Sequence, residues 1–146
     1  MKKIINEMKL RLPAMSGNEG VCRSVVSAFV SVLDPTVEEI GDIRCAVSEA
    51  VTNCIVHAYP GGDALHSYIY ISARLYDTRE VSIEISDNGC GISDLEHAMH
   101  PGVTEGGEGE RSGMGFLVME SFTDELKVKS APGRGTTVLM KKNLSP

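Results

Sequence analysis

Apolar residues recur along the chain with two different periods, and these periods predict the order of its strands and helices. Residues 4–12 (IINEMKLRL) partly alternate, as expected for a strand. Apolar residues at helical spacing then predict a helix over about 17–33. Residues 67–77 and 79–87 are rich in β-branched residues that alternate with polar ones, which predicts two strands joined by a short hairpin turn.

The clearest helical pattern runs over residues 35–59, before the first strand of this hairpin. Asp34 suits the N-cap and Pro35 the first helical position, while Pro60 and the two glycines after it end the pattern. The apolar positions that form one stripe along this helix are Ile40, Ile43, Val47, Val51, Ile55 and Ala58.

The last third of the chain alternates between glycine-rich segments and short regular elements. Helices are expected over 93–99 and 113–122, and strands over 125–130 and 136–143 with a turn between them. Residues 100–112 (HPGVTEGGEGERS) carry four glycines, a proline and three glutamates, which indicates a flexible loop. A loop of this length inside a compact domain is more often functional or disordered than a simple connection. The whole order predicts one α+β domain over 1–146: a two-layer α/β sandwich whose mixed, mostly antiparallel sheet is covered on one face by helices.

Composition and charge narrow the class of protein. The chain has 146 residues, 42% of them hydrophobic, and a net charge of −6 without a strongly basic patch, which argues against direct nucleic-acid binding. It shows neither a signal-peptide core nor a transmembrane segment, so we expect a cytoplasmic protein that binds no membrane. Its four cysteines lack Cys-x-x-Cys spacing, so we expect no zinc site and free, mostly buried thiols.

Three polar residues recur at every fourth position near the end of the long helix: Glu49, Asn53 and His57. At about 100° per residue they span an arc of about 80°, on the side opposite the apolar stripe. Ala46 and Ala50 flank them and are expected to leave room for a ligand. A solvated face would favour Lys, Arg and Glu, and Asn is poor in helix interiors. Two interpretations of this face therefore stay open. It holds a metal, a proton or a phosphate, or it is simply exposed to solvent.

Asp87 ends a buried strand and is followed at once by Asn-Gly-x-Gly. This pattern is typical of a turn, because Asn-Gly is a strong turn signal. It also suits a carboxylate that accepts hydrogen bonds from the amino group of a ligand, with Gly89 and Gly91 letting that ligand lie against the backbone.

Two further glycine-rich segments follow the flexible loop. In ERSGMGF, Gly113 and Gly115 open a helix, whose unpaired N–H groups would attract an anion, and Arg111 and Ser112 add a cation and a hydroxyl. The segment lacks the Gly-Lys-Ser/Thr ending of a P-loop, and a capped helix is its simpler explanation. The other segment, GRGTT, by itself indicates only a hairpin before the last strand.

Together, in this order and spacing, the four segments resemble the N, G1, G2 and G3 boxes of the Bergerat ATP-binding fold shared by gyrase, Hsp90, histidine kinases and MutL (GHKL). The boxes would be Glu49-x-x-x-Asn53-x-x-x-His57, Asp87-x-Gly89-x-Gly91, Gly113-x-Gly115 and Gly133-x-Gly135-Thr136. The loop at 100–112 would be the ATP lid. The segments VSEAVTNCIVHAY, ERSGMGF and GRGTTV are similar to the anti-sigma factor serine kinases of Gram-positive bacteria, and the ends of the chain to the sporulation members of that family.

The resemblance implies a homodimer that binds ATP or ADP with Mg²⁺, holds a sporulation sigma factor inactive, and phosphorylates a serine of a small anti-anti-sigma protein. It implies that Asn53 ligates Mg²⁺, which takes few protein ligands, and that Glu49 is the general base for the serine hydroxyl. It also implies that Asp87 accepts from the adenine amino group, with Thr136 nearby.

The family's phosphate contacts would fall on the backbone N–H groups of Gly113 and Gly115, with Arg111 and Ser112 closing over them. The lid departs from the family pattern, because it has Thr104 and three glutamates but no lysine. Which lid groups reach the γ-phosphate therefore stays open, and no role is assigned to His57.

Three other functions compete with this expectation. A related kinase of another stress regulon would share all four boxes. A histidine-kinase catalytic domain would need a phosphoacceptor helix, but residues 1–48 contain no histidine. A sigma-binding module that uses ATP only structurally would not need Glu49. The first strand is expected to be an edge at which two copies pair.

Overall fold

The computed structural model describes residues 1–62, 66–92, 99 and 115–146. The predicted helix at 93–99 and the predicted lid at 100–112 lie almost wholly outside these residues, and so do Thr104, Arg111, Ser112 and Gly113. The elements along the chain are β1 (Ile4–Pro13), α1 (Asn18–Val30), the 3-10 turn η1 (Ser31–Leu33), α2 (Val37–Asn53), the π-helical segment η2 (Cys54–Ala58), β2 (Tyr68–Tyr76), β3 (Glu80–Asp87), α4 (Gly115–Ser121), β4 (Glu125–Ser130) and β5 (Thr136–Asn143).

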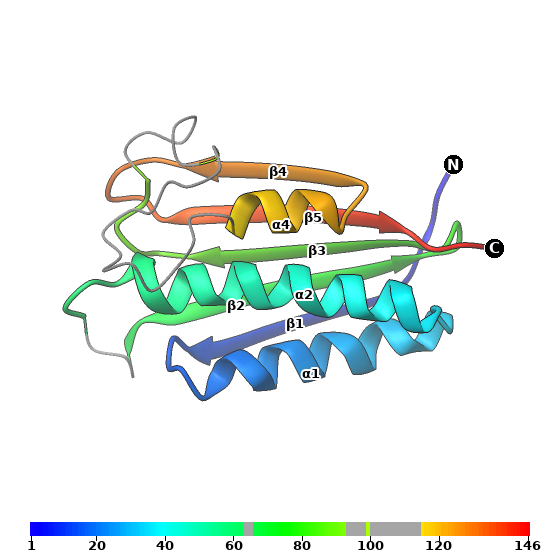
Figure 1. Cartoon of the computed structure of the whole chain (residues 1–146), viewed down its shortest axis with the longest axis horizontal. Helices are drawn as coiled ribbons and strands as arrows, with labels where there is room; N and C mark the ends of the chain where they lie inside the picture. Colours follow the sequence, from blue (N-terminus) through cyan, green and yellow to red (C-terminus); the bar gives the residue numbers. More distant parts are fainter. Residues whose placement is uncertain (63–65, 93–98, 100–114) are drawn as a thin grey trace.

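The strands form one five-stranded sheet in the order β1-β2-β3-β5-β4. Every pairing between these strands is antiparallel, and the register sets Ile71 opposite Ile85 and Ile85 opposite Val138, so that apolar residues line up on one face. Figure 1 shows α1, α2 and α4 side by side over that face. The predicted α+β sandwich with helices on one face of the sheet is therefore confirmed, but the described strands pair only antiparallel and do not form the predicted mixed sheet.

Helix α2 occupies the middle of the helix layer, with α1 on one side and α4 on the other (Figure 1). A helix with neighbours on both sides buries more than one stripe. Ile43, Val47 and Val51 are buried as predicted, but Ala46 and Ala50 are also only 1% exposed. The expectation that these two alanines leave room for a ligand is therefore wrong: their small side chains are part of the core.

The start of α2 also differs from the prediction. Thr36 is the N-cap: its hydroxyl accepts the Glu39 N–H at 3.1 Å, and Glu39 Oε1 accepts the Thr36 N–H at 2.9 Å. Asp34 instead adopts a left-handed conformation (φ 53°) that ends η1, so that Pro35 precedes the cap. The capping box was present in the sequence as Thr-x-x-Glu, a stronger start signal than a single aspartate. The N–H groups of Thr36 and Ser145 lower the pKa of Glu39.

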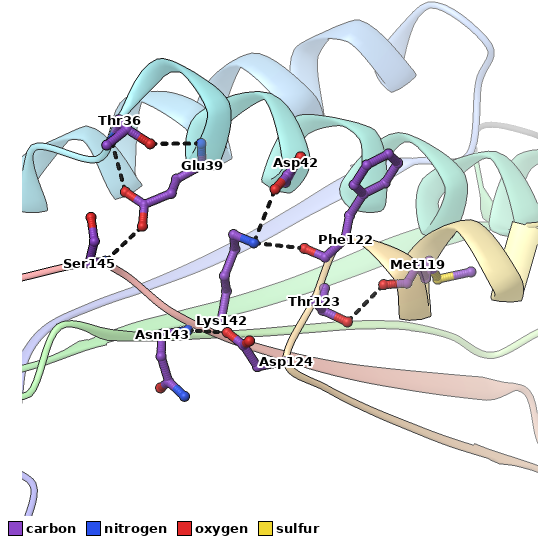
Figure 2. A network of polar contacts seen from close by, with 10 residues as sticks. All are labelled: Thr36, Glu39, Asp42, Met119, Phe122, Thr123, Asp124, Lys142, Asn143 and Ser145. Carbon is purple, nitrogen blue, oxygen red and sulfur yellow. Dashed lines mark hydrogen bonds and ion pairs between the residues drawn. The ribbon is translucent and has the colours of Figure 1, made fainter.

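A half-buried lysine joins α2, β5 and the end of α4 (Figure 2). Lys142 lies on the face of the sheet that the helices cover, and its Nζ donates to Asp42 Oδ2 at 3.2 Å and to the carbonyl of Phe122 at 3.1 Å. Phe122 directly follows α4, and the hydroxyl of Thr123 donates to the Met119 carbonyl at 2.7 Å. These bonds fix the C-terminal end of α4 against the central helix.

Both ends of the chain are held at the turn between β2 and β3. The N–H of Lys3 donates to Asp77 Oδ1 at 2.9 Å, and Arg79 Nε donates to the Ser145 carbonyl at 2.8 Å. Figure 1 shows the two termini at one end of the sheet, and the last turn of α2 with the first turn of α4 at the opposite end. Among the described residues no helix is long and apolar enough to cross a membrane.

Candidate functional site

The sheet end remote from the termini gathers the last turn of α2, the end of β3, the start of β5 and the start of α4 (Figure 1). Glu49 and Asn53 are half-buried there. A β-carbon placed on Gly115 would lie 3.3 Å from Glu49 Oε2 and 3.6 Å from both polar atoms of the Asn53 side-chain amide. The structure thus brings residues of two predicted boxes, more than 60 positions apart, into direct contact.

This corner suits a hard divalent cation with few protein ligands. Glu49 and Asn53 offer a carboxylate and an amide oxygen one helical turn apart, and neither is engaged in a hydrogen bond or ion pair with the described residues. Within those residues no group of three or more His, Cys, Asp or Glu side chains could enclose a metal alone. Mg²⁺ keeps several waters and binds through one or two protein oxygens plus substrate phosphates, so these two residues fit it.

The helix changes character directly after Asn53. Residues Cys54–Ala58 form the π segment η2, in which hydrogen bonds run from i to i+5. Glu49 and Asn53 thus lie in the regular helix α2, whereas His57 lies in the π-helical segment that follows it.

Asp87, at the end of β3, is only 7% exposed. Its Oδ1 accepts the Gly89 N–H at 2.9 Å and the Thr136 N–H at 3.2 Å, and its Oδ2 accepts the thiol of Cys54 at 3.5 Å. Burial raises the pKa of Asp87 above its ordinary value, and these three donors act against that increase. The predicted pair of Asp87 and Thr136 is thus brought together.

Glycines allow the segments around Asp87 to approach one another more closely than side chains would permit. Gly89 lies against the carbonyl of Ala58, where a β-carbon would overlap it, and the next N–H, of Cys90, donates to that carbonyl at 2.7 Å. Gly135 has a φ of +79° and lies against the carbonyl of Asp87. The loop after β3 is therefore fixed between the end of α2 and the start of β5, and Gly91 within it lies against Ala131.

Three further residues support this loop and were not singled out by the sequence. The Tyr59 hydroxyl accepts the Asn88 N–H at 2.8 Å and donates to the Tyr68 carbonyl at 2.7 Å. The Ser130 hydroxyl accepts the Ile92 N–H at 2.8 Å and lies 2.8 Å from Thr136 Oγ1. The third is Cys54. The contacts with Asn88, Ile92 and Asp87 leave no local sequence pattern, since each joins segments about 30 or more positions apart.

All four cysteines are free thiols, as predicted. Cys22 and Cys54 are buried, but Cys45 and Cys90 are exposed, so the expectation of mostly buried thiols holds for only two of them. Burial raises the pKa of Cys54 well above its ordinary value, and the Asp87 carboxylate adds to that increase. Cys54 is therefore a neutral hydrogen-bond donor.

The fold and the arrangement at this corner are those of an ATPase of the histidine kinase type, and residues 12–142 match the family model described as histidine kinase-like ATPase domain. An anti-sigma F factor of Caldanaerobacter subterraneus subsp. tengcongensis is 52% identical over 137 residues, covering 94% of this chain and 93% of that protein. Another, of Clostridium acetobutylicum, is 49% identical over 140 residues, covering 96% and 95%. The chain belongs to the histidine kinase-like ATPase family and, within it, to the group of the anti-sigma F factors.

Solved structures agree on the fold. The RsbU and RsbW domains of Rv1364c from Mycobacterium tuberculosis match with a TM-score of 0.70 and 19% identity, over 97% of this chain and 33% of that one. The histidine kinase domain of the blue-light activated kinase EL346 from Erythrobacter litoralis matches with a TM-score of 0.56 and 19% identity, over 91% and 62%. At such low identity these matches identify the architecture alone.

Proposed function

We propose that this protein is an anti-sigma factor with serine kinase activity. It binds a sporulation sigma factor of the sigma F type and holds it inactive, and it uses Mg-ATP to phosphorylate a serine of an anti-anti-sigma partner. The observation that carries the proposal is the contact of Glu49 and Asn53 with Gly115 at one side of the corner, with buried Asp87 at the other. The names of the relatives support the sigma-binding part.

Each residue has a defined task in this proposal. Asn53 would hold Mg²⁺ through its side-chain oxygen, and the ion would supply charge neutralisation on the phosphates. Glu49, one turn earlier on the same helix, orients the serine hydroxyl of the partner and accepts its proton. Asp87 accepts a hydrogen bond from the adenine amino group. Phosphoryl transfer depends mainly on such positioning and charge neutralisation, so few protein groups suffice.

The remaining assignments of the site fall on residues that the structure does not describe. Thr104, Arg111, Ser112 and Gly113 are proposed to contact the phosphates from a lid at about 100–112. With Gly115 they would place backbone N–H groups and one cation beside the Mg²⁺. Their roles follow from the resemblance of the motif alone.

We also propose that the protein acts as a homodimer that pairs through β1. This strand is an outer strand of the sheet, so one row of its backbone N–H and C=O groups has no strand beside it. Ile4 and Ile5 at its beginning are 43% and 52% exposed, which gives this edge an apolar surface for a second copy. We place this homodimer and its protein partners in the cytoplasm as part of the same proposal.

Phosphotransfer to a purified anti-anti-sigma protein tests the kinase proposal. With Mg-ATP, mass spectrometry should detect a phosphoserine on the partner, and Glu49→Gln should slow its formation by about 10²-fold or more, as for loss of a general base. Glu38→Gln is the matched control, because Glu38 is an exposed glutamate in the first turn of the same helix.

The outcomes separate the alternatives. ATP binding without transfer by the wild-type protein would refute the kinase and favour a sigma-binding module that uses ATP structurally. Transfer at equal rates by the wild type and Glu49→Gln would refute the role of Glu49 and leave the nucleotide site intact. Inhibition of a different stress sigma factor, with none of the sigma F type, would refute the choice of partner.

A further inference from the structure

The two oxygens of the Asp87 carboxylate have different surroundings. Oδ1 accepts two backbone N–H groups, from Gly89 and Thr136, at 2.9 and 3.2 Å. Among the described residues, Oδ2 accepts only the Cys54 thiol, at 3.5 Å. A carboxylate oxygen offers about two lone-pair sites, so Oδ1 is saturated and Oδ2 has one acceptor position left. A ligand amino group that approaches Asp87 must therefore bond to Oδ2.

We propose that Cys54 is a positioning residue for nucleobase recognition: its thiol holds Oδ2 of Asp87 in the orientation that accepts the 6-amino group of an adenine nucleotide. This inference rests on the proposed function, which makes Asp87 the adenine acceptor. Cys54 is 4% exposed and its thiol donates to Asp87, so it would act on the ligand through that carboxylate. It fixes the rotation of the carboxylate, which the two bonds to Oδ1 alone leave free to pivot.

The position of Cys54 in the chain gives this contact a second consequence. It directly follows Asn53, so the residue that orients the adenine acceptor and the residue proposed to hold Mg²⁺ are consecutive. The change from α to π geometry falls between them. The two ends of a bound nucleotide are thus positioned from one point of the helix.

Titration calorimetry with two nucleotides separates this role from simple packing. The ligands are Mg-ATP and the Mg complex of purine riboside 5′-triphosphate, which is identical except that it lacks the 6-amino group. The variants are Cys54→Ala, which removes the donor, and Cys54→Ser, which keeps one. Cys22→Ala is the matched control, because Cys22 is the other buried thiol, is 0% exposed and has no hydrogen bond to Asp87.

Cys54→Ala should weaken ATP binding about tenfold, the size expected for one hydrogen bond to a charged group, and change binding of the purine analogue less than twofold. Cys54→Ser should restore most of the ATP affinity, and Cys22→Ala should affect both nucleotides equally. Equal losses on the two nucleotides with Cys54→Ala, or none, would overturn the role of Cys54. A wild-type protein that binds the two nucleotides with equal affinity would also overturn the role of Cys54. A wild-type protein that binds neither nucleotide would overturn both that role and the proposed function.

Discussion

Replacing Gly115 by alanine should separate stability from activity in this protein. Gly115 is the first residue of α4, and the direction its β-carbon would take leads to Glu49 and Asn53. The nearest atom, Glu49 Oε2 at 3.3 Å, belongs to a half-buried side chain that can move by a few tenths of an ångström. The fold can therefore accept the methyl group, but the methyl group would fill the space beside the two side-chain oxygens that are proposed to act in phosphotransfer.

The substitution should leave the free energy of unfolding nearly unchanged but lower the rate of phosphotransfer. Alanine in place of glycine in a helix gains up to about 1 kcal/mol, and the tight contact with Glu49 offsets part of this gain, so the free energy of unfolding should stay within about 1 kcal/mol of the wild type. Displacement of Glu49 or Asn53 by a fraction of an ångström should reduce phosphotransfer at least tenfold, since a misplacement of about 1 Å costs about 10²-fold.

Urea denaturation and phosphotransfer kinetics on the same preparations test both parts. Gly41→Ala is the control, because Gly41 lies within α2 and a β-carbon there meets no atom within 4 Å. It should gain up to about 1 kcal/mol and retain full activity. A Gly115→Ala protein with wild-type activity would refute the inference that the space beside Glu49 and Asn53 is functional. One that is destabilised by several kcal/mol would refute the claim that the fold accepts the methyl group.

Two further substitutions test the energetics of one buried and one half-buried charged side chain. Because burial raises the pKa of Asp87, its charged form costs stability above the folded-state pKa, and the cost vanishes below the unfolded value of about 3.9. Asp87→Asn should therefore raise the Tm at pH 7 and raise it less near pH 4. The same substitution should abolish ATP binding, because it removes the proposed acceptor of the adenine amino group. A lower Tm at pH 7 would contradict the first expectation. Lys142→Met removes the bonds to Asp42 and Phe122 (Figure 2) and should lower the free energy of unfolding by about 1–3 kcal/mol. Lys141→Met, on the solvent face of the same strand, should cost less than about 0.5 kcal/mol in the same urea titration, and equal losses would argue against the Lys142 network.

The elements of this fold were predictable where the sequence pattern is local. The strands over 125–130 and 136–143 have the predicted bounds, because alternation and turn glycines act within a few residues. The start of α2 was misplaced because two candidate caps lie two residues apart, and the reciprocal bonds of Thr36 and Glu39 prevail over Asp34. The π segment was not predicted, since its residues keep helical composition and differ only in hydrogen-bond register.

The candidate site was predictable as a set of residue types and not as a geometry. The spacing of Glu49 and Asn53 placed them on one face, and the structure bears this out. That Gly115 covers them depends on how α4 packs on α2, which no local pattern encodes. The contacts of Cys54 and Tyr59 with residues 87 and 88 also join segments about 30 positions apart. Such pairings arise only when the sheet and the helix layer are assembled.

The attachment of both chain ends to the turn between β2 and β3 has a practical consequence. Lys3 contacts Asp77 and Ser145 contacts Arg79. Both termini lie at the end of the sheet opposite the last turn of α2 (Figure 1). A fluorescent reporter or a surface tether fused at either end would therefore leave open the corner that holds Glu49 and Asp87. With the ends so close, a short peptide linker could also join them, and the protein could be circularly permuted without cutting any strand of the sheet.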